Sequence, residues 1–308
     1  MIQFDHVTKL YGTVIGVNDV TLILEPGAYG LLGPNGSGKS TLLNLITGQL
    51  APTMGSLRVL GGRPRNRPEL CRRIGYCPGS AGLYSDVSGF EWVQYLLKLQ
   101  GMRSVDATRA AEETLVTVGM FDAMHRPIAS YSRGMRQRVK LAQALAHEPE
   151  LLILDEPFNG LDPVARHKMT LLLRDWIARG KSLLLASHIL YEVEAITQSF
   201  LLICGGRLLA SGTAKEVRQM LANLPNEITL RTSDPHRLAS LLAENHLADS
   251  LKITDHHVTV STRHPGQIYS MLPAWAEDAD LEILEMHSAD ESLQALFNSL
   301  MKIHRGEL

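Results

Sequence analysis

The stretch that decides the fold of this chain reads Gly33-Pro34-Asn35-Gly36-Ser37-Gly38-Lys39-Ser40. It fits the phosphate-binding pattern G-x-x-x-x-G-K-[ST], in which glycines let successive backbone N–H groups turn toward an anion. The helix that follows adds its own free N–H groups and its dipole. We expect Lys39 to reach the β- and γ-phosphates of a nucleoside triphosphate, and the Ser40 hydroxyl to bind Mg²⁺. An accidental match in a chain of this length has a chance on the order of one in a hundred.

Strands and helices alternate around this stretch. Ala28–Leu32 predicts a strand that runs into it, and Lys39–Thr47 predicts the helix that follows. Such alternation is typical of a parallel sheet with helices on its faces. From about residue 86 to residue 148 the sequence pattern is helical. This pattern predicts a helical subdomain inserted into the core. Other strands are predicted at Ile2–Val7, Val20–Leu24, Leu57–Leu60, Ile74–Tyr76, Leu151–Leu154, Ser182–Ala186 and Phe200–Cys204.

A second, smaller module is predicted after Pro225. Residues 227–308 contain six Lys and Arg against thirteen Asp and Glu, a net charge of −7, whereas residues 1–226 have a net charge of +5. This asymmetry indicates a domain boundary near residue 226. The module is predicted as a small α+β domain whose elements are Glu227–Thr232, His236–Asn245, Leu251–Thr262, Gln267–Trp275, Leu281–Met286 and Glu291–Met301.

The predicted fold class is therefore α/β. We expect an arrangement that resembles a P-loop NTPase (RecA-like) core with an inserted helical subdomain and an antiparallel β subdomain, followed by a C-terminal α+β domain. We expect the first domain, residues 1–226, to bind nucleotide and residues 227–308 to be an accessory domain.

Two acids follow the apolar strand Leu151–Leu154. Asp155 and Glu156 would emerge at the carboxyl end of a strand buried on both faces, which is where α/β sheets bind ligands. Asp155 could hold Mg²⁺, and Glu156 could polarise an attacking water as general base. An isolated Asp-Glu pair is more often a polar cap on a core strand, but the phosphate-binding stretch favours the catalytic interpretation.

Composition excludes several classes of protein. The net charge is −2, which gives no indication of a nucleic-acid partner, and the three cysteines, Cys71, Cys77 and Cys204, form no disulfide framework. A reducing, cytoplasmic location is expected. No apolar run reaches the length of a membrane span, and Met1–His6 lacks the features of a signal peptide.

Several further motifs, in a fixed order, resemble the ATP-binding-cassette (ABC) family over about residues 1–220. The segment from Tyr131 to Arg138 resembles the family's signature segment, in the variant of multidrug- and antibiotic-exporter-like (ABC-2 type) subunits. Gly160-Leu161-Asp162 resembles the D-loop, and Ser187-His188 resembles the switch histidine. Tyr11 matches the aromatic residue that stacks on adenine.

The resemblance implies an ATPase that works as a head-to-tail homodimer with two shared ATP sites. The signature residues of one copy, Ser132, Arg133, Gly134 and Met135, would close over the γ-phosphate held by the other copy. From the sequence, Ser132 is also predicted as the N-cap of a long helix, which directs its hydroxyl and the first N–H groups outward. His188 would orient the attacking water, and Asp162 would be part of the D-loop. ATP would bind to the P-loop and to Thr41. Separate permease subunits would hold the chain at the cytoplasmic face of a membrane.

Two positions depart from the family's pattern. Gly79 stands where the family usually has a Gln or Glu that touches Mg²⁺ and the attacking water, so we expect modest ATPase activity, with water or Ser80 as substitutes. Phe158 replaces a small hydroxyl residue, and packing against the partner is one interpretation of it. Two rival functions follow: a soluble ABC ATPase that is not coupled to transport, and an ATP-gated binding module that scarcely hydrolyses.

Two weaker patterns indicate no specific function. Six arginines lie between Arg58 and Arg73 without interleaved aromatics, which favours a solvated surface over nucleic-acid binding. Seven of the twelve histidines lie in residues 227–308, but no metal-ligand spacing stands out.

Glu291-Ser292-Leu293 with Phe297 loosely fits a C-terminal module that exporter-like subunits carry, for which homodimer contact or regulation is expected.

Overall fold

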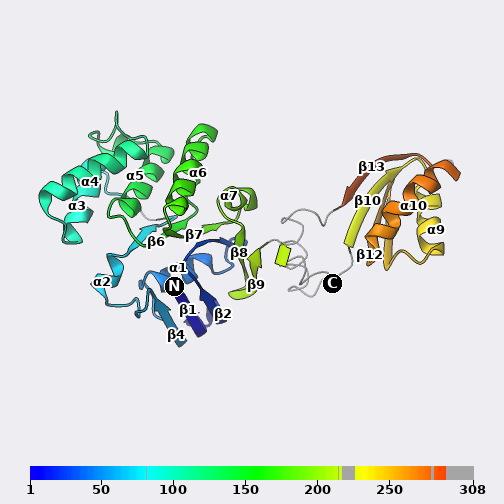
Figure 1. Cartoon of the computed structure of the whole chain (residues 1–308), viewed down its shortest axis with the longest axis horizontal. Helices are drawn as coiled ribbons and strands as arrows, with labels where there is room; N and C mark the ends of the chain where they lie inside the picture. Colours follow the sequence, from blue (N-terminus) through cyan, green and yellow to red (C-terminus); the bar gives the residue numbers. More distant parts are fainter. Residues whose placement is uncertain (81, 214, 217–225, 279–280, 289–308) are drawn as a thin grey trace. The chain divides into compact units, whose positions relative to one another are not determined.

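The computed structural model describes residues 1–80, 82–213, 215–216, 226–278 and 281–288. The chain divides into two compact units, Met1–Thr213 and Ala214–Leu308 (Figure 1). The domain boundary near residue 226 stays a prediction. The helix expected at Glu291–Met301 and the Glu-Ser-Leu stretch lie outside the described residues.

A six-stranded sheet, in the order β5-β6-β7-β3-β8-β9, forms the centre of the first unit. Neighbouring strands pair in parallel, except that β9 is antiparallel to β8. Every residue of β6 and β7 is buried, as the continuous apolar runs predict for strands covered on both faces. The strands are β3 Ala28–Leu32, β5 Ile74–Cys77, β6 Leu151–Asp155, β7 Ser182–Ser187, β8 Ser199–Cys204 and β9 Arg207–Thr213.

Among the described residues of the first unit, helices α1, α2, α6 and α7 lie outside the helical subdomain, and α1 is the next element after β3. The apolar side of α1 packs into a core that it shares with β6, β7 and β8. Its bounds and those of its neighbours are α1 Lys39–Ile46, α2 Pro68–Cys71, α6 Pro163–Ala178 and α7 Leu190–Glu194.

An antiparallel sheet in the order β2-β1-β4 packs its apolar face on the same core. Strands β1 (Ile2–Tyr11) and β2 (Val14–Leu24) are longer than predicted and join in a tight hairpin. Gly12 allows this turn because its φ of 61° is in the left-handed region. The third strand, β4, spans Met54–Val59.

Helices α3 (Gly89–Leu99), α4 (Ser104–Thr117) and α5 (Arg133–Leu145) form the predicted helical subdomain. Figure 1 shows them together beside the sheet. Ser88 begins α3 with a capping box, in which its side chain and that of Glu91 each accept from the other's backbone N–H.

The second unit has the β-α-β-β-α-β order of a split βαβ domain, with the sheet order β11-β12-β10-β13. Each strand pair among its described residues is antiparallel. The apolar face of the sheet packs against the two helices, seen together on it in Figure 1. The elements are β10 Asn226–Thr232, α9 Pro235–Glu244, β11 Ser250–Thr254, β12 His257–Thr262, α10 Pro265–Asp278 and β13 Ile283–Ser288. No helix among the described residues is long and apolar enough to cross a bilayer.

Candidate functional site

The phosphate-binding stretch forms a tight loop between β3 and α1. Gly36 and Gly38 have φ values of 79° and 107°, which favour glycine. A Cβ at Gly38 would lie 2.4 Å from the Gly16 carbonyl oxygen, so no larger residue fits without a shift. The hydroxyl of Ser37 is buried and has no hydrogen-bond partner. An unpaired buried hydroxyl in such a loop fits a site that is completed by a polar ligand.

Lys39 lies inside the loop with only 6% of its side chain exposed. Its Nζ donates to the carbonyl oxygens of Gly33 at 2.6 Å and Pro34 at 3.1 Å, and lies 4.0 Å from Glu156 Oε1. Burial lowers the pKa of Lys39, while Glu156 and then Asp155 oppose this shift. The two carbonyl oxygens and the more distant carboxylate compensate the buried positive charge only in part. Lys39 is therefore suited to bind an anionic ligand.

Ser40 and Asp155 meet as the sequence predicts. The Ser40 hydroxyl donates to Asp155 Oδ2 at 2.9 Å, although the two residues are 115 positions apart. Burial raises the pKa of Asp155, and the hydrogen bond from Ser40 partly offsets this. A buried carboxylate beside a hydroxyl is a pair of hard oxygen ligands whose negative charge needs a cation, and this fits Mg²⁺.

Glu156 and His188 also lie together. His188 Nδ1 is 2.9 Å from both carboxylate oxygens of Glu156, so the imidazole N–H can donate to either. Glu156 has a φ of 50°, which is uncommon outside glycine, and its N–H donates to the Ala186 carbonyl. This left-handed turn at the end of β6 directs the carboxylate toward Lys39 and His188 rather than into the sheet.

A buried network behind Glu156 was not predicted. Ser187 donates to Glu192 at 2.9 Å and lies 3.5 Å from Glu156 Oε2. Arg166 of α6 pairs with the other oxygen of Glu192 at 2.9 Å. Burial raises the pKa of Glu192, with Ser187 and Arg166 opposing. The network holds β7 and α7 against α6 where His188 leaves the sheet.

A cavity of about 430 Å³ opens over the loop. One wall carries Tyr11, Val14 and Ile15, whose side chains are 45%, 64% and 51% exposed. A Cβ at Gly16 would lie 2.7 Å from the Tyr11 ring, so this glycine lets the ring lie close to the strand. These exposed apolar surfaces form a platform of the kind on which a base stacks. The cavity's lining is Tyr11, Val14, Ile15, Gly16, Asn35, Gly36, Ser37, Gly38, Lys39, Ser40, Thr41, Gly79, Ser80, Asp155, Glu156 and Asn159.

The signature segment does not line this cavity. Ser132 is the N-cap of α5 as predicted, and its hydroxyl accepts from the Met135 N–H at 3.2 Å. The aliphatic part of the Arg133 side chain packs against Gly160, whose φ is 78°. A Cβ at Gly160 would lie 2.5 Å from Arg133 Cγ. A Cβ at Gly134 would lie 2.9 Å from the Gly160 carbonyl oxygen. The signature segment and the D-loop of one chain therefore pack on each other.

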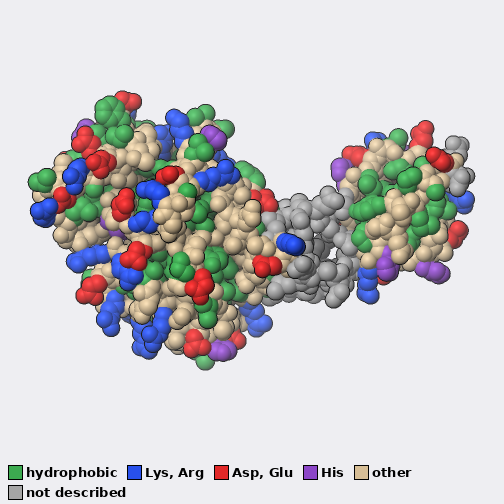
Figure 2. Space-filling model, in the orientation of Figure 1, with side chains coloured by type: hydrophobic (Ala, Val, Ile, Leu, Met, Phe, Trp, Pro, Cys, Tyr) green, Lys and Arg blue, Asp and Glu red, His purple; other side chains and the backbone are tan. Residues whose placement is uncertain are grey.

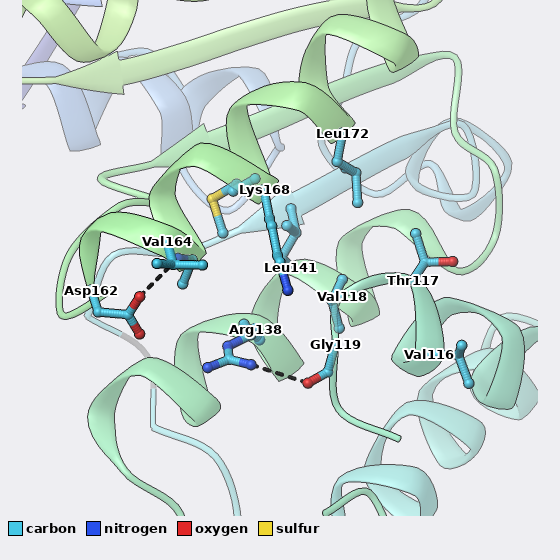
Figure 3. A pocket seen from close by; sticks show the side chains of 12 residues that line it. Val116, Thr117, Val118, Gly119, Arg138, Leu141, Asp162, Val164, Lys168 and Leu172 are labelled. Carbon is cyan, nitrogen blue, oxygen red and sulfur yellow. Dashed lines mark hydrogen bonds between the residues drawn. The ribbon is translucent and has the colours of Figure 1, made fainter. Parts of the chain in front are cut away.

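Asp162 begins α6 as its N-cap and accepts from the Ala165 N–H at 2.8 Å. Figure 3 shows it at one end of a second cavity, of about 320 Å³, between the end of α4, α5 and α6. In that view Arg138 donates to the Gly119 carbonyl oxygen, at 3.0 Å, across the cavity floor. Phe158, for which a contact with the partner was one interpretation, is instead buried in its own chain.

Gly79 lies beside the Ser40–Asp155 pair. A Cβ built on it would be 3.3 Å from the Asp155 carbonyl oxygen and 3.5 Å from Oδ2, so a side chain here would enter the site. The buried Lys140 of α5 lies 3.4 Å from the carbonyl oxygens of Pro78 and Gly79. This contact links the signature helix to the loop after β5, and no sequence pattern predicted it.

Comparison with known proteins shows the family to which this chain is similar. Residues 17–159 match the family model described as ABC transporter. The chain is 33% identical to the Nod factor export ATP-binding protein I of Rhizobium johnstonii over 92% of this chain and 90% of that protein. It is 29% identical to the linearmycin resistance ATP-binding protein LnrL of Bacillus subtilis over 97% of this chain and 98% of that protein.

Solved structures resemble the first unit. One is an ATP-binding subunit of an ABC transporter, with a TM-score of 0.66 and 30% identity, covering 72% of this chain and 93% of that chain. Another is a dimeric bacterial ABC transporter cassette, with a TM-score of 0.65 and 25% identity, covering 69% and 98%. Both similarities agree with the predicted α/β fold.

Proposed function

Because this chain belongs to the ABC transporter family, we propose that it is the ATP-hydrolysing subunit of a membrane exporter. The observation that carries the proposal is the meeting of Lys39, the Ser40–Asp155 pair and the Glu156–His188 pair at one edge of the sheet. The relatives named for Nod factor export and linearmycin resistance support a role in export.

In the proposed reaction, Lys39 and the loop N–H groups neutralise and orient the triphosphate. Glu156 takes the proton of the attacking water, and His188 holds the carboxylate in place through its N–H. Upon ATP binding, Lys39 would exchange its contacts with Gly33, Pro34 and Glu156 for phosphate oxygens. That exchange frees Glu156 to face the water.

Ser40 and Asp155 are the residues that would hold Mg²⁺, which would neutralise charge between the β- and γ-phosphates. Tyr11 would stack on adenine, and Thr41 would extend the loop's contacts to the phosphates. Tyr11 and Thr41 are already linked, because their hydroxyl oxygens lie 3.4 Å apart.

We propose that a second copy of the chain completes each site. Ser132 is exposed at the start of a 13-residue helix, and none of Ser132, Arg133, Gly134 and Met135 is among the residues that line the described cavity. A head-to-tail pair would bring this helix start over the γ-phosphate of the other copy, where its N–H groups favour an anion. Because Gly134 packs on Gly160, Asp162 would lie in the same interface.

An exposed aromatic patch is the proposed permease contact. Tyr84, Tyr95 and Leu99 are 73%, 56% and 64% exposed, and the Tyr84 and Trp92 ring centroids are 5.4 Å apart. Aromatic side chains gathered on a surface are typical of protein interfaces. The patch lies on α3 and on the loop that begins at Gly79, so a partner seated there would adjoin the ATP site.

This partner would place the chain at the cytoplasmic face of the membrane. Residues 1–226 would form the nucleotide-binding domain, and residues 227–308 an accessory domain for homodimer contact or regulation.

The test is a pulldown of the tagged chain from detergent-solubilised membranes of its source cells. An integral membrane protein should be retained by the wild type and lost with Tyr84→Ala/Tyr95→Ala/Leu99→Ala. Exposed residues elsewhere provide the control Val105→Ala/Leu171→Ala, which should retain it. Retention of no membrane protein by the wild type would favour the soluble ATPase instead.

One observation keeps a second candidate in view. Gly79 offers no side chain to Mg²⁺ or water beside Asp155, which favours a module that binds ATP and hydrolyses it slowly. Equal, slow hydrolysis by the wild type and Glu156→Gln would support this candidate.

A further inference from the structure

A third cavity lies away from the P-loop, at the segment that joins β4 to β5. Its volume is about 610 Å³. Four of its nine lining residues are arginines. The lining is Arg58, Leu60, Gly61, Gly62, Arg63, Arg67, Glu69, Leu70 and Arg73, and we call it the arginine cleft. Figure 2 shows Lys and Arg side chains gathered over the part of the first unit in which Figure 1 places α2 and β4.

One arginine of the cleft is already neutralised. Arg73 donates to both carboxylate oxygens of Glu150, at 2.6 and 2.8 Å, and to the Leu60 carbonyl oxygen at 3.3 Å. This bidentate pair fixes Arg73 as part of the cleft wall. Its charge is therefore not available to a ligand.

The other three arginines have no such partner. Arg58, Arg63 and Arg67 are exposed, and none of them forms a salt bridge or a side-chain hydrogen bond with a described residue. Glu69 is the one acid in the lining. With Glu69 and Glu150 set against four arginines, the cleft keeps a charge of +2. Like charges held around one hollow repel each other, and an anion would relieve that repulsion.

We propose that the arginine cleft binds a phosphate-bearing anion. Planar guanidinium groups match the oxygens of phosphate in pairs, which makes arginine the usual residue for such sites. The hollow is larger than one phosphate group, and Leu60 and Leu70 add apolar side chains to its lining. Its lining contains no aromatic side chain on which a base could stack, so the site recognises phosphate and not a nucleobase.

Such an anion could be an anionic lipid headgroup or a free phosphate compound, and two measurements separate them. The first is co-sedimentation with vesicles of phosphatidylcholine, with or without phosphatidylglycerol. The wild type should bind only the vesicles that contain phosphatidylglycerol. Arg58→Gln/Arg63→Gln/Arg67→Gln should lower the partition coefficient roughly 100-fold, because each cation near such a surface contributes about fivefold.

The second measurement is calorimetric titration with inorganic pyrophosphate. It is made on Lys39→Ala chains, in which the P-loop binds phosphates weakly, with and without the three arginine substitutions. Heat that disappears with the arginine substitutions identifies a free phosphate compound as the ligand. Both outcomes leave ATP hydrolysis of the arginine variant at the wild-type level, so the cleft is tested separately from the proposed ATPase.

A matched variant controls for net charge. Arg109→Gln/Arg237→Gln/Lys252→Gln removes three exposed cations elsewhere. It should bind vesicles like the wild type and, when combined with Lys39→Ala, should bind pyrophosphate like Lys39→Ala alone. The single variant Arg63→Gln should lower the partition coefficient for vesicles about fivefold. It tests the cleft even if the triple variant misfolds. The proposal is overturned if the vesicles do not bind the wild type and pyrophosphate does not bind the Lys39→Ala chain, or if the control and the arginine variant lose binding equally.

Discussion

Replacing Glu156 by glutamine changes one proton-accepting group and very little of the shape of the site. Glutamine can accept the hydrogen bond that His188 Nδ1 makes at 2.9 Å, but it cannot take a proton from water. Loss of a general base typically costs 10²–10⁴-fold in rate, and we expect the kcat of ATP hydrolysis to fall by about that factor.

The same substitution should not weaken ATP binding. Lys39 Nζ lies 4.0 Å from Glu156 Oε1, a separation at which unit charges attract by about 4 kcal/mol for an effective dielectric constant of about 20. Without that carboxylate, Lys39 is free for the phosphates, and one negative charge that repels ATP is gone. We expect a Kd for ATP that is unchanged or lower, and accumulation of the ATP-bound dimer.

The assay combines phosphate release under steady-state conditions, equilibrium dialysis with labelled ATP, and the molar mass of the chain with and without ATP. Glu150→Gln is the matched control, because this acid pairs with Arg73 away from the P-loop cavity. That pair is about half exposed, so the control should cost at most about 1 kcal/mol of stability and leave kcat near the wild-type value. A Glu156→Gln chain that hydrolyses ATP within threefold of the wild type would refute the role of Glu156 as base.

Three further predictions concern the metal, the glycine loop and pH. Ser40→Ala removes the hydroxyl that lies 2.9 Å from Asp155, so ATP affinity measured by dialysis should fall about tenfold with Mg²⁺ and stay unchanged with EDTA; an equal loss in both would argue against a Mg²⁺ ligand. Gly79→Gln introduces a side chain beside Asp155 and should raise kcat several-fold; an unchanged or lower rate would count against the position's part in orienting water. Burial lowers the pKa of His147, whose Nε2 lies 3.1 Å from the Ile74 carbonyl oxygen. Since the unfolded state then binds a proton that the native state does not, the Tm should drop as pH falls below about 6.5, and His147→Gln should reduce that drop; identical pH profiles would disprove it.

Much of the core follows from local patterns. Neighbouring residues specify the P-loop, the strands β3, β6 and β7, and the N-cap at Ser132. The sequence therefore predicts these features well. The contacts of Ser40 with Asp155 and of Glu156 with His188 follow as well, because carboxyl ends of parallel strands meet at one edge of the sheet.

The missed features depend on distant or weak signals. Helix α7 has five residues, too few for a helical period, and the role of Glu192 depends on Arg166, 26 residues away. The hairpin of β8 and β9 turns at Gly205-Gly206, a two-residue signal that could have predicted β9. The contact of Lys140 with the Gly79 loop arises only when α5 packs on β5.

The most direct test of the central claim is complementation between two inactive chains. Lys39→Ala disables the P-loop of its own chain, and Ser132→Arg blocks the signature that is offered to the other chain. In a head-to-tail dimer, a mixed pair gathers both defects in one site and leaves the other site intact. An equal mixture should therefore recover about a quarter of the wild-type ATPase activity, although each variant alone is inactive. A mixture that stays as inactive as its components would contradict a site shared between two copies.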